Sequence, residues 1–224
     1  MSLAREVWLV AGKDLRVEAR SRVTLNQVLP FGAVVLLLFA FALDPDRGLL
    51  SEVAPGLFWV AVLLAAVLAV SRSFAVEAEH GAIDGLRLSG LDGASVFLGK
   101  TLAIAVQLLL LELVLGIGVV VFYDTAVRSV AVLVLAGVAA TVGIAATGTL
   151  FGVLAAGLRT RETLVPLLLL PIVAPVMLGA TRAFEAGLDG VPSEAWPWVQ
   201  LLALFAVLYL GVGVLAFGSL LEDA

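Results

Sequence analysis

The main pattern along this chain is the alternation of long uncharged runs with short stretches that hold nearly all of the charge. A helix needs about 20 apolar residues to cross the roughly 30 Å hydrocarbon layer of a bilayer. We place six runs of about that length at residues 23–43, 53–71, 101–123, 129–158, 163–180 and 195–221. Since lipid offers the backbone no hydrogen-bond partners, each run is predicted to be a helix.

Composition supports this interpretation. Of the 224 residues 62% are apolar and 14% are charged, whereas a soluble domain has about 45–50% apolar and about 25% charged residues. We therefore predict an all-α integral membrane protein with residues 1–224 forming one transmembrane domain. The chain has no cysteine, which excludes disulfides, thiolate metal sites and cysteine nucleophiles.

The distribution of lysine and arginine predicts the orientation. If the N-terminus is cytoplasmic, ten basic residues fall inside and three outside, so both termini are expected in the cytoplasm. The inner ten are Arg5, Lys13, Arg16, Arg20, Arg22, Arg72, Arg87, Lys100, Arg159 and Arg161, and the outer three are Arg47, Arg128 and Arg182. Rings expected at the outer interface, where amphipathic aromatics gather, are those of Trp59, Tyr123, Trp196 and Trp198.

The first 22 residues are expected to form a helix that lies along the inner membrane surface. Apolar side chains recur there at roughly helical spacing with charges between them, at Leu3, Val7, Val10 and Leu15. This pattern is typical of interfacial helices. The alternative is a basic leader that only sets the topology.

The second non-spanning segment, residues 72–100, is much the longest predicted loop and is expected on the cytoplasmic side. It mixes acidic with apolar residues and is punctuated by glycines. Exposed apolar side chains favour a partner surface, although a solvated connector is the alternative.

Three features stand out within the spans. Glu112 lies at the middle of the third span, and a carboxylate at mid-bilayer costs about 2.5–3.5 kcal/mol, so it should face protein or water. It either lines a translocation path or bonds another helix, through Gln107, Thr141 or Thr147. Prolines in the fifth span, including Pro171 and Pro175, predict a kinked or broken helix with a functional role. The Gly148-x-x-x-Gly152 face predicts close helix packing.

The inventory of reactive side chains argues against an enzyme. His80 is the single histidine and lies in the predicted inner loop, so no triad or histidine metal cluster can be assembled. The segment from Gly93 to Thr101 is similar to a phosphate-binding loop, but it has five residues between its glycines where the loop needs four. If ATP drives this protein, another chain must bind it.

Several short segments follow one another along the chain in a recognisable order. They are Ala54-Pro55-Gly56 with Trp59-Val60; Phe74, Glu77, Gly81, Asp84 and Leu86, ending at Lys100; Gly152 with Gly157-Leu158-Arg159; and Leu168-Leu169-Leu170-Pro171 followed by Pro175 and Gly179. Together they resemble the haem exporter protein B family (CcmB), a membrane subunit of the bacterial cytochrome c maturation system. The similarity covers nearly the whole chain. The sequence departs from the family pattern at 88–92, where a proline-containing turn is usual.

The resemblance implies an ABC-2-type exporter permease in the bacterial inner membrane, forming a homodimer. It implies an ATPase subunit (CcmA-like) that holds ATP and magnesium, a haem-handling membrane subunit (CcmC-like) and a periplasmic haem chaperone (CcmE-like). The loop at 72–100 would then couple to the ATPase. The contact residues that the resemblance implies are Glu77, Glu79, Gly81, Asp84, Leu86 and Leu88. Nucleic acid is not an expected partner.

Haem is the expected cargo of such a complex, yet this chain offers few axial ligands. Its histidine lies on the inner side, and Met177 and Tyr209 are the in-span candidates. We therefore predict no cofactor and no stable haem ligation in this chain. The alternatives are a permease for a lipid, drug or glycan, a secondary transporter driven by an ion gradient, and a structural scaffold.

Overall fold

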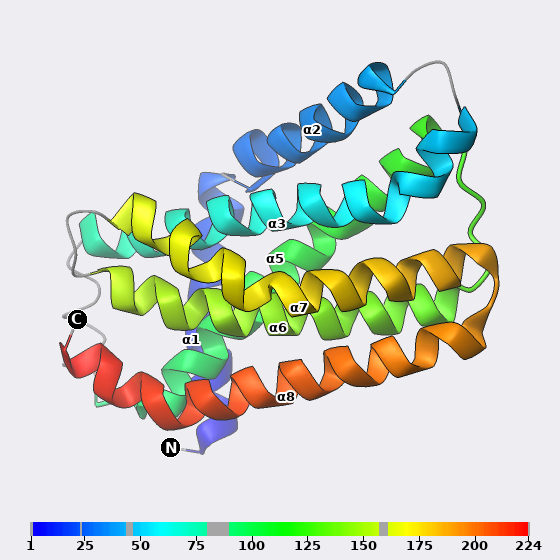
Figure 1. Ribbon diagram of the computed structural model, residues 1–224. Coiled ribbons are helices and arrows are strands. Elements are labelled where there is room, and N and C mark those ends of the chain that lie inside the picture. The colour runs from blue at the N-terminus through cyan, green and yellow to red at the C-terminus, as the bar shows by residue number, and fades with distance from the viewer. Residues whose placement is uncertain (1, 23, 44–46, 80–89, 157–160, 224) are drawn as a thin grey trace.

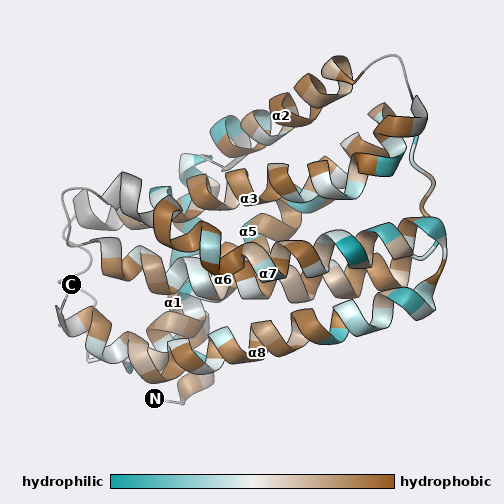
Figure 2. Ribbon diagram, in the orientation of Figure 1, coloured by the Kyte–Doolittle hydropathy of each residue, from teal (hydrophilic) through white to brown (hydrophobic). Residues whose placement is uncertain are grey.

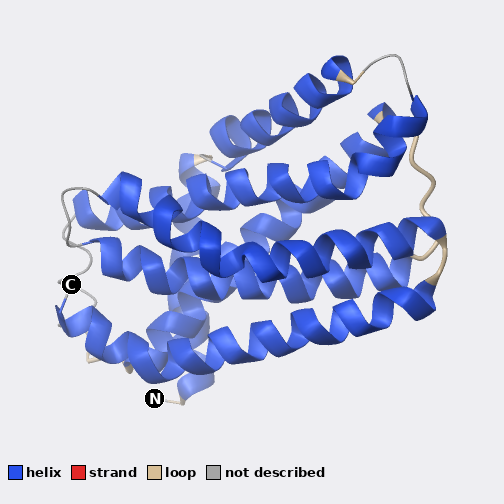
Figure 3. Ribbon diagram, viewed as in Figure 1, coloured by secondary structure: helices blue, strands red, loops and turns tan. Residues whose placement is uncertain are grey.

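The computed structural model describes residues 2–22, 24–43, 47–79, 90–156 and 161–223, and within these ranges the regular structure is entirely helical (Figure 3). The helices are α1 (Leu3–Ser21), a short π-helical turn η1 (Thr24–Val28), α2 (Leu29–Ala42), α3 (Arg47–Glu79), α5 (Gly93–Phe122), α6 (Val130–Ala156), α7 (Arg161–Asp189) and α8 (Pro192–Asp223).

The long helices form a bundle, and α1 runs across it toward one end (Figure 1). Helices α3, α6, α7 and α8 lie roughly side by side, while α5 passes obliquely behind them and contacts α1, α2, α3, α6 and α8. Both chain termini lie toward the end where α3 finishes and α5 begins, which we call the α1 end. The α5–α6 and α7–α8 connections lie at the opposite end, which we call the far end.

The apolar runs coincide with the helices. Five helices are long and apolar enough to cross a membrane, and a sixth crossing is possible where α1 and the segment Asn26–Ala42 meet at a bend of 55°. Figure 2 shows hydrophobic residues along the middle of the long helices and hydrophilic ones nearer the ends. The first predicted run, 23–43, corresponds to η1 and α2 together. The all-helical membrane architecture is confirmed.

Helices α3 and α5 extend further than the predicted spans. The segment 72–79, expected in a loop, completes α3, and 93–100 forms the first turns of α5. Both extensions have protein partners: Phe74 is buried against α6 at Gly152, and the start of α5 packs on α1. The segment predicted as the inner loop, 72–100, is therefore helical at 72–79 and 93–100, and its cytoplasmic placement and coupling role stay predictions.

The predicted glycine face on α6 packs against α3 as expected. A Cβ atom added to Gly148 would lie 2.6 Å from Val70, and one added to Gly152 would overlap the ring of Phe74. Small residues let two helix backbones approach closely where apolar surface alone gives no net attraction in lipid. The close α3–α6 contact thus depends on glycine, which has no side chain, at positions 148 and 152.

Two of the four aromatic residues expected at the outer interface are instead buried. Trp59 is fully buried, with its ring centroid 5.0 Å from that of Phe184 on α7. Tyr123 is also buried and donates a 2.8 Å hydrogen bond to the backbone carbonyl of Leu36 on α2. These rings join helices within the bundle, so their predicted role as membrane-interface anchors is wrong.

Of the two predicted outcomes at the prolines, a kink or a break, the break does not occur, because α7 is continuous; its ribbon changes direction in the first half (Figure 1). Pro171 and Pro175 each lack the N–H that would bond the carbonyl four residues earlier. Near this point the hydroxyl of Tyr209 on α8 donates a 2.8 Å hydrogen bond to the carbonyl of Ile172. A side chain from α8 therefore supports the bent part of α7.

We predict that Gly152→Leu destabilises the bundle, because the new side chain overlaps Phe74. Overpacking of this kind typically costs about 1–3 kcal/mol. Gly211→Leu is the matched control, since a Cβ at Gly211 meets open space. Thermal unfolding in detergent, followed by the fluorescence of the four tryptophans, should show a lower Tm for Gly152→Leu only. Equal Tm values for the two variants would contradict the prediction.

Candidate functional site

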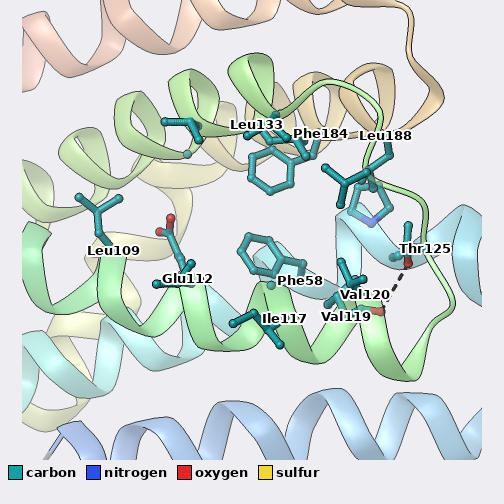
Figure 4. Close-up of a pocket in the computed structure, with 18 of the residues that line it drawn as sticks. Phe58, Leu109, Glu112, Ile117, Val119, Val120, Thr125, Leu133, Phe184 and Leu188 are labelled. Carbon is teal, nitrogen blue, oxygen red and sulfur yellow. Dashed lines mark hydrogen bonds between the residues drawn. The ribbon is translucent and has the colours of Figure 1, made fainter.

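An apolar groove of about 440 Å³ lies between α5 and α6. Its floor is formed by α3 and α7, and Figure 4 shows Phe58, Phe184 and Glu112 directed into it. Most of its lining is aliphatic or aromatic, including Phe58, Leu109, Ile117, Val120, Leu133, Phe184 and Leu188. An apolar concavity with a single buried carboxyl is the kind of place where a hydrophobic ligand is oriented by one polar group.

Glu112 is the polar group at the inner end of the groove. Its side chain is 8% exposed, and Oε1 accepts a hydrogen bond from the hydroxyl of Thr141 on α6. Oε2 faces Gly137, where an added Cβ would lie 3.5 Å away. Glu112 was expected to face protein or water, and it is buried against protein. Of its three candidate partners, Thr141 donates this bond. The hydroxyl of Thr147 bonds the carbonyl of Gly143 in its own helix at 2.8 Å.

The far end of the groove meets a second, polar pocket of about 360 Å³. The two share Pro55, Thr125 and Leu188 in their linings. We call this polar pocket the mouth; its charged residues are Glu52, Asp124, Arg128, Glu185 and Asp189. The guanidinium of Arg128 donates a 3.0 Å hydrogen bond to the carbonyl of Asp189, and Arg182 forms a 2.8 Å ion pair with Glu185. Carboxylates thus outnumber guanidinium groups.

One side of the groove opens on the outer surface of the bundle. Several of its lining residues are more than half exposed, namely Leu113, Ile117, Val121, Val130 and Val134. These side chains are all apolar, so the opening presents an apolar surface. In the single chain the groove is therefore open sideways as well as at the mouth.

A second constellation joins α1, α3 and α5 at the α1 end. Lys100 is 2% exposed; its Nζ atom lies 3.4 Å from Oδ2 of Asp14 on α1 and 5.0 Å from the ring centroid of Phe74 on α3. The adjacent Gly99 admits Val10 of α1, since an added Cβ would lie 2.6 Å from that side chain. The pair and the close approach fix α1 against the start of α5.

This junction also bears on nucleotide binding. The segment from Gly93 to Thr101 forms the first turns of α5, and the hydroxyl of Thr101 donates a 3.3 Å hydrogen bond to that of Thr149. In a phosphate loop the residues between the two glycines form a loop around the phosphate, whereas in this segment they are helical from Gly93 onward.

The predicted partner-contact residues lie near the α1 end or outside the described ranges. Glu77 and Glu79 belong to the last turn of α3. Gly81, Asp84, Leu86 and Leu88, together with His80, lie outside the described residues. Their role in partner contact stays a prediction.

The membrane candidates are not brought together. Glu112 lines the groove, but Pro171 is exposed on α7 and Pro175 is partly buried, and the part of α7 that reaches the groove is Phe184 and Leu188. Within the described ranges, no group of three or more His, Cys, Asp or Glu side chains is placed to hold a metal ion.

Sequence reasoning missed the Lys100–Asp14 pair. A signal was present, because Lys100 is the one charge between Asp92 and Glu112. It was assigned to the end of a loop since the helix was expected to begin at residue 101. The polar mouth gave no signal, because its residues come from three separate stretches of the chain.

The bundle of long apolar helices has the architecture of a multi-pass integral membrane protein. The model of the CcmB protein family matches residues 5–223, so this chain belongs to the CcmB family, and the resemblance noted in the sequence is confirmed.

Individual relatives agree with this assignment. The chain is 32% identical over 208 residues to heme exporter protein B of Pseudomonas aeruginosa, covering 89% of this chain and 90% of the relative. It is 32% identical over 181 residues to the protein of the same name in Bradyrhizobium diazoefficiens, covering 79% and 80%. It is 29% identical over 212 residues to that of Escherichia coli K12, covering 93% of each.

Removing the Glu112–Thr141 hydrogen bond from one side should destabilise the bundle. Thr141→Val leaves the carboxyl without its donor, which typically costs about 1–3 kcal/mol. The double variant Thr141→Val/Glu112→Leu should recover much of that loss, because replacing both partners with apolar groups of similar shape is nearly neutral. Thr147→Val is the control, since its hydroxyl serves its own helix. Strictly additive losses of Tm in the double variant would refute this coupling.

A parallel test applies to the junction of α1 and α5. Asp14→Ala leaves Lys100 buried without this carboxylate, and breaking a buried pair from one side costs up to about 3–5 kcal/mol. Asp14→Leu/Lys100→Met should restore stability, and Lys13→Met, at an exposed partner of Asp14, should have little effect. Detachment of α1 would appear as faster tryptic cleavage at Arg16 and Arg20. Unchanged cleavage in Asp14→Ala would show that the pair does not hold α1.

Proposed function

We propose that this chain is the membrane permease subunit of an ABC transporter complex that acts in haem export and haem-chaperone release during cytochrome c biogenesis. The observation that carries the proposal is the family match over residues 5–223, together with relatives named heme exporter protein B. The chain itself is not catalytic under this proposal. A separate ATPase subunit binds and hydrolyses ATP with its magnesium.

The coupling surface is the connection between α3 and α5. Its proposed contact residues are Glu77, Glu79, Gly81, Asp84, Leu86 and Leu88. Helices α3 and α5 flank this connection and also form the floor and one wall of the groove. A displacement of the connection by the ATPase would therefore act on both helices at once.

The proposed orientation places both termini and the α3–α5 connection in the cytoplasm and the mouth in the periplasm. It rests on the ten-to-three distribution of basic residues. Helix α1 suits a position at the membrane surface: Trp8 and Leu9 are exposed, whereas Val10 and Ala11 are buried. An apolar surface on both sides suits a helix held between a bundle and the bacterial inner membrane.

Haem is the cargo of the complex in this proposal, and this chain transmits motion instead of holding haem stably. Tyr209, one of the two in-span candidates for ligation, donates its hydroxyl to Ile172, which supports this division of roles. A CcmC-like subunit would handle haem and a CcmE-like chaperone would receive it. Two copies of the permease would together form a symmetric binding surface for a dimeric ATPase.

We expect Glu79→Ala combined with Leu86→Ala to weaken association with the ATPase subunit by about tenfold or more, which corresponds to 1.4 kcal/mol. The reason is the loss of one charged and one apolar contact on the coupling surface. The measurement is co-purification from detergent followed by titration of the ATPase and assay of ATP hydrolysis. Glu185→Ala combined with Glu194→Ala, at the far end, is the matched control. Equal affinity for all three proteins would rule out the proposed coupling surface.

A further inference from the structure

The groove between α5 and α6 has the dimensions of a binding site for one hydrocarbon chain. The distance along α5 from Glu112 to Val121 is nine residues, or about 13.5 Å at 1.5 Å per residue, close to half of the roughly 30 Å hydrocarbon layer. Its volume of about 440 Å³ holds about fifteen groups of water size, at about 30 Å³ each. A chain that enters from one leaflet would fill it down to Glu112.

The inner end of the groove is defined by the carboxyl of Glu112. The hydroxyl of Thr141 holds this carboxyl toward α6, and Gly137 leaves space beside it. Between Glu112 and the mouth the lining is mostly aliphatic and aromatic (Figure 4). The apolar stretch therefore has a fixed length and a fixed direction, from Glu112 to the mouth.

The mouth has the charges that a zwitterionic head group needs. The guanidinium of Arg128 is the type of group that pairs with a phosphate, and the carboxylates of Glu52 and Asp124 line the same pocket. Because Pro55, Thr125 and Leu188 belong to both linings, a head group in the mouth is continuous with a chain in the groove.

We propose that this groove binds one acyl chain of a phospholipid whose head group carries both a phosphate and a primary ammonium, as in phosphatidylethanolamine. The phosphate lies toward Arg128 and the ammonium toward the carboxylates. The lipid enters sideways, between the exposed apolar residues of α5 and α6. This inference concerns a bound membrane lipid and is independent of the cargo of the complex.

The excess of carboxylates distinguishes this ligand from other amphiphiles. A phosphatidylglycerol head group offers a negative phosphate and no cation, so Glu52 and the other mouth carboxylates oppose it. Haem, with its two propionate groups, is opposed in the same way. The mouth thus selects for an amphiphile that contributes a positive charge.

The test is photolabelling of the purified membrane complex in nanodiscs, with phosphatidylethanolamine that carries a diazirine on one acyl chain. Phosphatidylglycerol with the same labelled chain is the comparison, and mass spectrometry locates the adducts. We expect adducts on residues 113–121 and 130–138. Labelling by phosphatidylethanolamine should be about tenfold stronger than labelling by phosphatidylglycerol, a preference of 1.4 kcal/mol. Equal labelling by the two lipids, or adducts spread evenly over all exposed helices, would overturn the proposal.

Two pairs of variants sharpen this result. Gly137→Leu fills the groove beside Glu112 and should abolish labelling there, whereas Gly211→Leu, on an open face of α8, should leave it unchanged. Glu52→Lys should reduce the preference for phosphatidylethanolamine to near unity, and Glu194→Lys, outside the mouth, should not. Labelling of Gly137→Leu at the level of the unmodified protein would contradict the groove as the site.

The competing occupant is a second copy of the chain. The protein has no cysteine, so Ile117→Cys gives a single reactive thiol in the opening of the groove. With a short bismaleimide, the proposal expects no covalent dimer through this position in the nanodisc complex. Efficient dimer formation would show that protein covers the groove and would overturn the proposal.

Discussion

The hydrocarbon layer supplies no hydrogen bonds, and the polar groups within this bundle are arranged around that constraint. Three of them are paired with a partner from another helix: Glu112 with Thr141, Tyr123 with the carbonyl of Leu36, and Tyr209 with that of Ile172. Among the described residues, two buried side-chain atoms, Trp59 Nε1 and Ser95 Oγ, have no hydrogen-bond partner. The bonds between helices therefore determine which faces meet, where apolar contact alone would not distinguish them from lipid.

Helix α5 is the element on which most of these contacts depend. It contacts α1 through Lys100, and α6 through Thr101 and Glu112. Tyr123, the residue that caps its C-terminal end, bonds α2. A predicted span of residues 101–123 excluded Lys100 and the first two turns. The omission matters because those turns carry the junction with α1, and they are helical on account of protein contacts that hydropathy does not measure.

The sequence predicts which segments contact lipid, but it does not predict how the helices contact one another. Lipid exposure leaves a direct mark in composition, so the helical class, the six apolar runs and the burial of Glu112 could all be derived. The choice of Thr141 among three polar partners could not, since it depends on the relative rotation of α5 and α6. Trp59 and Tyr123 were misplaced for a related reason: a ring near the end of a span suits the membrane interface and a helix contact equally well, and packing decides.

The two constellations lie toward opposite ends of α5, and this arrangement has a consequence for coupling. Lys100 is twelve residues before Glu112, about 18 Å along a helix, and no break in α5 separates them. When α5 moves as a unit, a shift of its first turns against α1 is carried along the helix past the Thr101–Thr149 contact with α6 to Glu112. Where α6 does not follow that shift, the Glu112–Thr141 hydrogen bond and the groove beside it change with it.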